Sequence, residues 1–195
     1  MVKRVIVITG TPCVGKTTIA RLLAHKINAS YINLTELAVK EGIILGVDEK
    51  RGSMIVDEEK MKKRIKEIVE SATEENIVVD GHYAQHVVPD EITMHVLVLR
   101  RDPEELQKLM IKAGYSGNKL WENLAAEILD VCLVEALHAY SKDKICELNV
   151  TSRSPEDVVN EILEVIKGSR KCSIGIVDWL GKLEMEGKLE EYLKI

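Results

Sequence analysis

The chain has 195 residues, of which 46% are hydrophobic and 30% charged, and its formal net charge is −5. This composition is typical of one globular domain with a small appendage, and the negative charge argues against broad electrostatic binding to nucleic acid. Met-Val-Lys-Arg leads directly into an apolar segment without room for a signal peptide, and no apolar run approaches the roughly 18 residues of a membrane span, so we expect a cytoplasmic protein.

The first predicted element is a strand at residues 5–8, followed by the spacing Gly10-x-x-x-x-Gly15-Lys16-Thr17 and then a helical pattern. The two glycines permit backbone conformations in which successive amides turn toward a polyphosphate, and the helix adds the positive end of its dipole. Lys16 can reach the β- and γ-phosphates, and the hydroxyl of Thr17 can bind Mg²⁺. This strand, loop and helix predict an ATP-binding phosphate loop.

The segment from residue 30 to residue 72 carries four further patterns. Tyr31-Ile32 predicts a short strand, and residues 35–40 predict a short helix that ends at Gly42. Residues 42–56 carry glycines among charges, so we expect a mobile loop that is either a flap over a substrate or plain surface. Residues 57–72 are amphipathic, and their basic run fits a solvated helix face or, alternatively, an RNA contact.

A second buried strand is predicted at residues 77–79, and it ends in Asp80-Gly81-His82. In an open α/β sheet, ligands bind at the carboxyl ends of parallel strands. Asp80 can there hold Mg²⁺ or a water molecule bound to it, and His82 can orient or deprotonate an attacking water. The alternatives are structural: Asp80 caps a turn, and His82 is a hydrogen-bonded loop histidine.

The second half of the chain continues the alternation of strands and helices. A strand at residues 95–99 precedes a helix that begins after Asp102 and runs to about residue 112. These are followed by a short turn at residues 115–117, a long helix at 120–140, a strand at 145–150 and a helix capped by Ser154 that runs to residue 167. Together the elements predict an α/β fold with a parallel sheet covered on both faces.

Seven short segments, in order along residues 4–167, resemble one family. They are Gly-Thr-Pro-Cys-Val-Gly-Lys-Thr-Thr at residues 10–18, Tyr31-Ile32-Asn33, Asp57-Glu58, Val79-Asp80-Gly81-His82, Leu99-Arg100, Gly114-Tyr115 and Glu127-Ile128. The family is that of adenylate kinase isoenzyme 6. These archaeal and eukaryotic nuclear proteins combine nucleoside monophosphate kinase and ATPase activity with maturation of the small ribosomal subunit.

The resemblance implies a P-loop NTPase domain of the nucleoside monophosphate kinase type at residues 1–167, built on a five-stranded parallel sheet. A flap for the nucleoside monophosphate (NMP) would lie near residues 33–56 and a short lid near 112–122. The implied reaction is ATP + AMP ⇌ 2 ADP, with slower ATP hydrolysis. The implied partner is a platform protein of the small ribosomal subunit, held during rRNA processing.

The resemblance also implies roles for individual residues. Thr17 and Asp80 would serve Mg²⁺, His82 would belong to the hydrolysis motif, and the adenine would lie near Arg153 and Ser154. Cys13 stands where this loop more usually has glycine. A cysteine can replace glycine here, because only its backbone amide is needed, provided that its φ and ψ angles are ordinary. The residues implied to bind ATP are Gly10, Cys13, Gly15, Lys16, Thr17 and Thr18.

This chain departs from the family pattern at three expected arginines, where it has Val39, Leu109 and Ala113. A lysine stands beside each of these positions, at Lys40, Lys108 and Lys112, and we expect Lys112 to act in catalysis. Lysine supplies charge but lacks the planar fork with which arginine holds a phosphate. We therefore expect weak kinase turnover.

The remaining features of the sequence are the four cysteines and the C-terminal segment. Cys13, Cys132, Cys146 and Cys172 are scattered without a C-x-x-C pair, so we expect reduced thiols rather than a zinc site or a disulfide. Residues 168–195 lie outside the resemblance and carry two apolar faces and Trp179. We expect either two short helices that pack back on the domain or a contact with a partner.

Three functions remain open at this stage. The first is a metabolic adenylate kinase that balances adenine nucleotides. The second is an ATPase assembly factor with little kinase activity, whose nucleotide cycle times the docking of a ribosomal protein. The third is a kinase for another small molecule, such as shikimate or a nucleoside, which shares the phosphate loop but not the Asp-x-His pattern.

Overall fold

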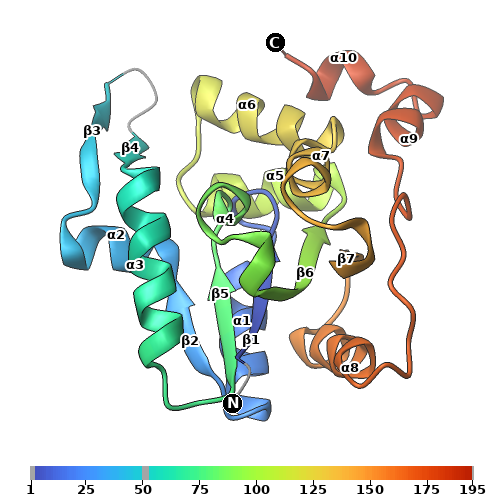
Figure 1. Ribbon diagram of the computed structural model, residues 1–195. Coiled ribbons are helices and arrows are strands. Elements are labelled where there is room, and N and C mark those ends of the chain that lie inside the picture. The colour runs from blue at the N-terminus through green and yellow to red at the C-terminus, as the bar shows by residue number, and fades with distance from the viewer. Residues whose placement is uncertain (1–2, 50–52, 195) are drawn as a thin grey trace.

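A five-stranded sheet forms the centre of the protein (Figure 1). The computed structural model describes residues 3–49 and 53–194. All neighbouring strands in the sheet run parallel, and the strand order β2-β5-β1-β6-β7 places the phosphate-loop strand in the middle. The predicted α/β architecture is confirmed. The strands are β1 (Arg4–Thr9), β2 (Ser30–Asn33), β5 (Asn76–Asp80), β6 (Thr93–Arg100) and β7 (Ile145–Asn149).

The two faces of the sheet follow from the alternation of side chains along β1. Ile6 and Ile8 point into one apolar cluster, which α1, α5, α6 and α8 cover. Val5 and Val7 point into a second cluster, which α2, α3, α4 and α7 cover. Because both faces are covered by helices, β1 is apolar and buried at every position from Val5 to Ile8.

The helices begin and end close to the predicted positions. Asp102 caps its helix by accepting a hydrogen bond from the amide of Glu104 at 2.9 Å, and Ser154 accepts one from Asp157 at 3.1 Å. None of the helices in the described part of the chain is long and apolar enough to cross a membrane. The helices of the domain are α1 (Lys16–Lys26), α2 (Leu34–Glu41), α3 (Glu58–Ser71), α4 (Ala84–Val87), α5 (Pro103–Lys112), α6 (Gly117–Ile128), α7 (Val131–Ala139) and α8 (Pro155–Ile166), with 3-10 turns η1 (Asp90–Ile92) and η2 (Lys142–Lys144).

The prediction of one long helix at residues 120–140 is wrong. Two helices, α6 and α7, meet at Asp130, whose φ of 58° lies in the left-handed region and breaks the helical path. The carboxylate of Asp130 accepts a hydrogen bond from the buried guanidinium of Arg100. An aspartate tolerates this backbone conformation better than most residues, and the ion pair with Arg100 holds the break in place.

The prediction of a loop at residues 42–56 is also wrong. The strands β3 (Ile44–Asp48) and β4 (Ser53–Val56) pair antiparallel into a hairpin that projects from the domain (Figure 1). Lys50, Arg51 and Gly52, which belonged to that prediction, lie outside the described residues. The hairpin stands over the carboxyl ends of the strands, where a flap over a substrate would lie.

The tail packs back on the domain, as one of the two alternatives predicted. It forms α9 (Trp179–Met185) and α10 (Leu189–Tyr192) beside α6 (Figure 1). Trp179, Leu183 and Tyr192 are buried in the cluster that covers one face of the sheet. The ammonium groups of Lys182 and Lys188 pair with Asp102 and Glu104 at the start of α5.

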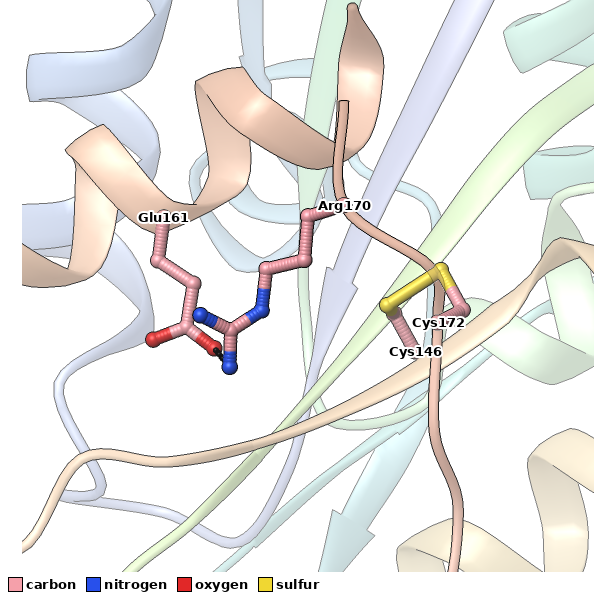
Figure 2. Close-up of a disulfide and its surroundings, with 4 residues drawn as sticks. All are labelled: Cys146, Glu161, Arg170 and Cys172. Carbon is pink, nitrogen blue, oxygen red and sulfur yellow. Dashed lines mark ion pairs between the residues drawn. A yellow bond between two sulfur atoms is a disulfide. The ribbon is translucent and has the colours of Figure 1, made fainter. Parts of the chain in front are cut away.

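The expectation of reduced cysteines is wrong for one pair, because Cys146 and Cys172 form a disulfide (Figure 2). The tail runs along the free edge of β7, where the amide of Glu147 donates to the carbonyl of Ser173 at 2.9 Å. The carboxylate of Glu147 in turn accepts from the amide of Ile176 at 2.9 Å. This edge pairing brings together two cysteines 26 residues apart, which their spacing in the sequence does not reveal.

Candidate active site

A cavity of about 370 Å³ opens at the carboxyl ends of β1 and β5, between the hairpin and the start of α6. In parallel sheets this edge is where ligands bind. Four parts of the chain contribute to its wall. They are the phosphate loop (Pro12, Lys16, Thr17), the segment from the end of β2 to β4 (Asn33, Thr35, Ala38, Ser53, Met54, Val56), the end of β5 with the turn after it (Asp80, Gly81, His82, Tyr83) and the start of α6 with the residues before it (Tyr115, Lys119).

The backbone of the phosphate loop depends on its two glycines. Gly10 has a φ of 136°, and a Cβ at this position would lie 2.5 Å from the carbonyl oxygen of Leu99. Gly15 has a φ of 114° and precedes α1 without a side-chain cap, so the first amides of that helix keep no side-chain acceptor. A helix start of this kind binds anions such as phosphate.

Cys13 does not meet the condition of ordinary backbone angles. Its φ is 66°, in the left-handed region that glycine adopts without strain. A side chain costs about 1 to 2 kcal/mol in this conformation. Burial raises the pKa of the Cys13 thiol, although the charge of Lys16 works against that shift.

The ammonium of Lys16 lies inside the loop. It donates to the carbonyl oxygens of Gly10 and Thr11, at 2.9 Å each. Burial lowers its pKa, and nearby acidic groups, among them Asp80 and Glu127, partly offset that effect. A second cation reaches the same loop, because Arg101 Nε donates to the carbonyl oxygen of Val14 at 3.1 Å.

Asp80 is 1% exposed and is held by two residues of the neighbouring strand. Its carboxylate accepts hydrogen bonds from the hydroxyl of Tyr31 and the side-chain amide of Asn33, both at 2.7 Å. Asp80 and the hydroxyl of Thr17 line the same cavity. These hard oxygen donors fit Mg²⁺, which is typically held by one or two carboxylates together with waters and substrate phosphates.

His82 follows Asp80 in the turn after β5 and is exposed toward the cavity. Desolvation within the site, together with the charges of Lys16 and His86, lowers the pKa of His82 to about 4. Its imidazole is therefore neutral at pH 7. The ring meets that of Tyr83 edge to face, with centroids 5.1 Å apart, and the Tyr83 hydroxyl is buried without a hydrogen-bond partner among the described residues.

Several predicted site residues do not line the cavity. The side chain of Lys112 is exposed at the end of α5, and Ser154 caps α8. Arg153 pairs with Glu161 at 2.6 Å. Thr18 is exposed on α1, whereas Gly10, Cys13 and Gly15 shape the loop through their backbone.

The cation that lines the cavity from the start of α6 is Lys119. It lies in the first turn of α6, with its ammonium 5.4 Å from the centre of the Tyr115 ring. The sequence-based prediction began this helix at Leu120, three residues late, and so overlooked Lys119. Ser116 could have indicated the correct start at Gly117, because serine is preferred at the position just before a helix.

The buried carboxylate of Glu127 joins the site to the rest of the protein. It accepts from the hydroxyl of Thr11 in the phosphate loop at 2.6 Å and from Arg100 Nε at 3.0 Å. It also accepts from the indole of Trp179 in the tail at 3.1 Å. Sequence reasoning gave Glu127 no role, although a glutamate among the apolar residues of a helix face was a detectable signal.

Comparison with known proteins gives two kinds of match. Residues 6–130 match the protein family described as AAA domain. A protein of Methanocaldococcus jannaschii named "Putative adenylate kinase" is 41% identical over 177 residues, covering 91% of this chain and 93% of that protein. A protein of Pyrococcus furiosus with the same name is 39% identical over 179 residues, covering 90% and 91%.

Solved structures share the fold at low sequence identity. A gluconokinase from Sinorhizobium meliloti is 14% identical with a TM-score of 0.54, covering 86% of this chain and 94% of its own. A shikimate kinase from Acinetobacter baumannii, solved with shikimate, is 16% identical with a TM-score of 0.60, covering 87% and 96%. These likenesses concern the fold alone and confirm the predicted phosphate-loop kinase architecture.

Proposed function

The chain belongs to the AAA domain family and is a relative of the archaeal proteins named after adenylate kinase, and on this premise we propose that it transfers a phosphoryl group from ATP to AMP. The observation that carries the proposal is the shared cavity. Lys16, Asp80 and Lys119, from three distant parts of the chain, all line one space of about 370 Å³. That volume lies within the range typical of small-molecule sites.

The phosphate loop has the groups that bind a polyphosphate. The amides at the start of α1 and the ammonium of Lys16 offer positive charge on the same side of the cavity. Thr17 and Asp80 would hold Mg²⁺, which neutralises phosphate charge when it is bound. Tyr31 and Asn33 keep the Asp80 carboxylate oriented toward that position.

Lys119 takes the place that we first assigned to Lys112. Of these two lysines, only Lys119 lines the cavity, opposite the flap residues that would surround the phosphate acceptor. A cation on the lid favours the charge that develops on a transferring phosphoryl group. Since Lys119 is a point charge rather than a bidentate fork, we expect turnover to remain below that of an arginine clamp.

ATP hydrolysis is the second activity that we propose. A neutral imidazole can accept a hydrogen bond from water, and His82 is neutral at pH 7. Because a pKa of about 4 makes it a weak base, His82 would orient the attacking water rather than remove its proton. Arginines at three positions would favour fast phosphoryl transfer, but this chain has the exposed Val39, Leu109 and Ala113 there. The absence of these arginines favours ATP hydrolysis over transfer to AMP. By resemblance, such a cycle would act in maturation of the small ribosomal subunit, through a platform ribosomal protein. An ATP-sensitive complex with that protein would support this role over a purely metabolic one.

The test is steady-state ADP formation from Mg-ATP, with and without AMP. We expect Lys16→Met to abolish both activities and Lys119→Gln to lower the AMP-dependent rate by about tenfold or more, whereas Lys112→Gln is the matched control with little effect. His82→Ala should reduce the AMP-independent hydrolysis selectively. Activity that survives Lys16→Met, or an equal loss in the two lysine variants, would contradict the proposed site.

A further inference from the structure

A second hollow lies at the opposite end of the sheet from the phosphate loop. It is a groove of about 740 Å³ between the starts of β6 and β7, the turn η2, the end of α8 and the tail. The starts of parallel strands are at the far edge from their carboxyl ends, so this groove is separate from the candidate active site. None of the residues that line it lines the cavity around Lys16.

The groove combines an apolar floor with a cationic rim. The apolar residues that line it are the partly buried Ile174 and, beneath it in the core, Ile145 and Val165, which are 1% and 4% exposed. On the rim, the exposed Lys142 and Lys171 have no acidic partner among the described residues, and Asp143 is the acid that lines the groove. Positive charge therefore predominates here in a chain whose net charge is −5.

The wall of the groove formed by the tail is held in place at two points (Figure 2). The disulfide between Cys146 and Cys172 ties the tail to β7, and Arg170 pairs with Glu161 of α8 at 2.6 Å. A wall held in this way is preorganised, so a ligand does not have to order it on binding. Because Arg170 is engaged by Glu161, the unpaired cations of the rim, within the part of the chain that the structure describes, are Lys142 and Lys171.

His95 supplies an unused hydrogen-bonding group. Both of its ring nitrogens are buried and have no hydrogen-bond partner among residues 3–49 and 53–194, although the residue lines the groove and is only partly buried. Its side-chain surface toward the groove is therefore carbon. A half turn about the Cβ–Cγ bond exchanges ring carbon and nitrogen positions and presents a nitrogen to the groove. A buried polar group without a partner is costly, and a ligand with an acceptor or donor would remove that cost.

We propose that this groove binds a small organic anion. Its carboxylate or phosphate lies between Lys142 and Lys171, its apolar body lies on the floor, and a nitrogen of His95 hydrogen-bonds to it. A small ligand fits better than a macromolecule because the groove offers two unpaired cations, which lie on η2 and on the tail. The site is independent of the proposed kinase activity.

The probes are phenyl phosphate, benzoate and the uncharged benzyl alcohol. Each is titrated into the full chain while the histidine ring signals are followed by NMR, with the signal of His95 assigned by its loss in His95→Phe. The His82 signal in the same spectrum reports binding at the candidate active site. We expect at least one anion to shift the His95 signal in a saturable way, and benzyl alcohol to bind about tenfold more weakly or less. Phenyl phosphate alone would indicate a phosphate ligand, and benzoate alone a carboxylate.

The matched variants test the two lysines. Lys142→Gln combined with Lys171→Gln should weaken anion binding by about tenfold, whereas Lys167→Gln, an exposed lysine outside the groove, should leave it unchanged. Phosphoryl transfer should be unchanged in all of these variants, so failure here is distinguishable from failure of the kinase proposal. The inference is overturned if neither anion shifts the His95 signal at about 10 mM, if benzyl alcohol binds equally well, or if the double variant binds like Lys167→Gln.

Discussion

Replacing Cys172 by serine should make the stability of the protein independent of redox conditions. The disulfide closes a loop between residues 26 apart, and the loop-closure entropy of a loop of this size corresponds to about 3.5 kcal/mol at 25 °C. Cys172 is only partly buried, so the exchange of sulfur for oxygen adds little to this figure. We therefore expect Cys172→Ser to lower the free energy of unfolding by about 3 kcal/mol under oxidising conditions.

The assay is unfolding in guanidinium chloride, with and without dithiothreitol. The difference between the wild type and Cys172→Ser should disappear when the reductant is present, because both chains then lack the bond. Cys132→Ser is the control, since Cys132 is a free thiol and its loss should leave the redox dependence of the wild type unchanged. In denaturant without reductant, the wild type should show two reactive thiols, Cys13 and Cys132. Four reactive thiols, or a difference that persists in dithiothreitol, would refute the reasoning.

Three further predictions concern the candidate site. Cys13→Gly should raise the free energy of unfolding by about 0.5 to 1 kcal/mol, measured in guanidinium chloride, because glycine adopts the φ of 66° without strain; a loss of stability would contradict this. Glu127→Gln should destabilise the protein by about 3 kcal/mol, seen as a lower Tm, because the buried Arg100 loses a charged partner, whereas the exposed Glu184→Gln should change little. The pKa of His82 is about 4 when folded against 6.5 ordinarily, so the unfolded chain binds the proton more tightly and stability falls as the pH drops from 6.5 to 4. Thermal unfolding at pH 7 and pH 5 should therefore show a smaller decrease for His82→Asn than for the wild type, and an equal decrease would argue against the lowered pKa.

The elements predicted correctly are those in which local sequence and tertiary packing require the same structure. The run Val5 to Ile8 is apolar at every position because both faces of β1 are covered, and that run is visible in the sequence. The starts of α5 and α8 follow from Asp102 and Ser154, whose side chains bind amides two or three residues further on. The left-handed conformation at Gly42 ends α2, also as predicted.

The two wrong predictions of secondary structure have different causes. The predicted helix at 120–140 is interrupted at Asp130, whose carboxylate accepts a hydrogen bond from Arg100, a residue far away in the sequence. The segment at 42–56 is rich in glycine and charge, yet its two halves pair with each other as β3 and β4. This pairing is local, but strand formation depends more on its context than helix formation does, so composition alone did not reveal it.

The sequence by itself determined the strand, loop and helix around Gly10 to Thr17, and the position of Asp80 at the end of a neighbouring strand, because these depend on spacing within a few residues and on the geometry of a parallel sheet. Only the tertiary structure decided that Lys119 rather than Lys112 lines the cavity. It also decided that Cys146 meets Cys172. Both outcomes depend on how α6 and the tail fold back over the sheet, and the free energy of that packing is shared among residues far apart in the chain.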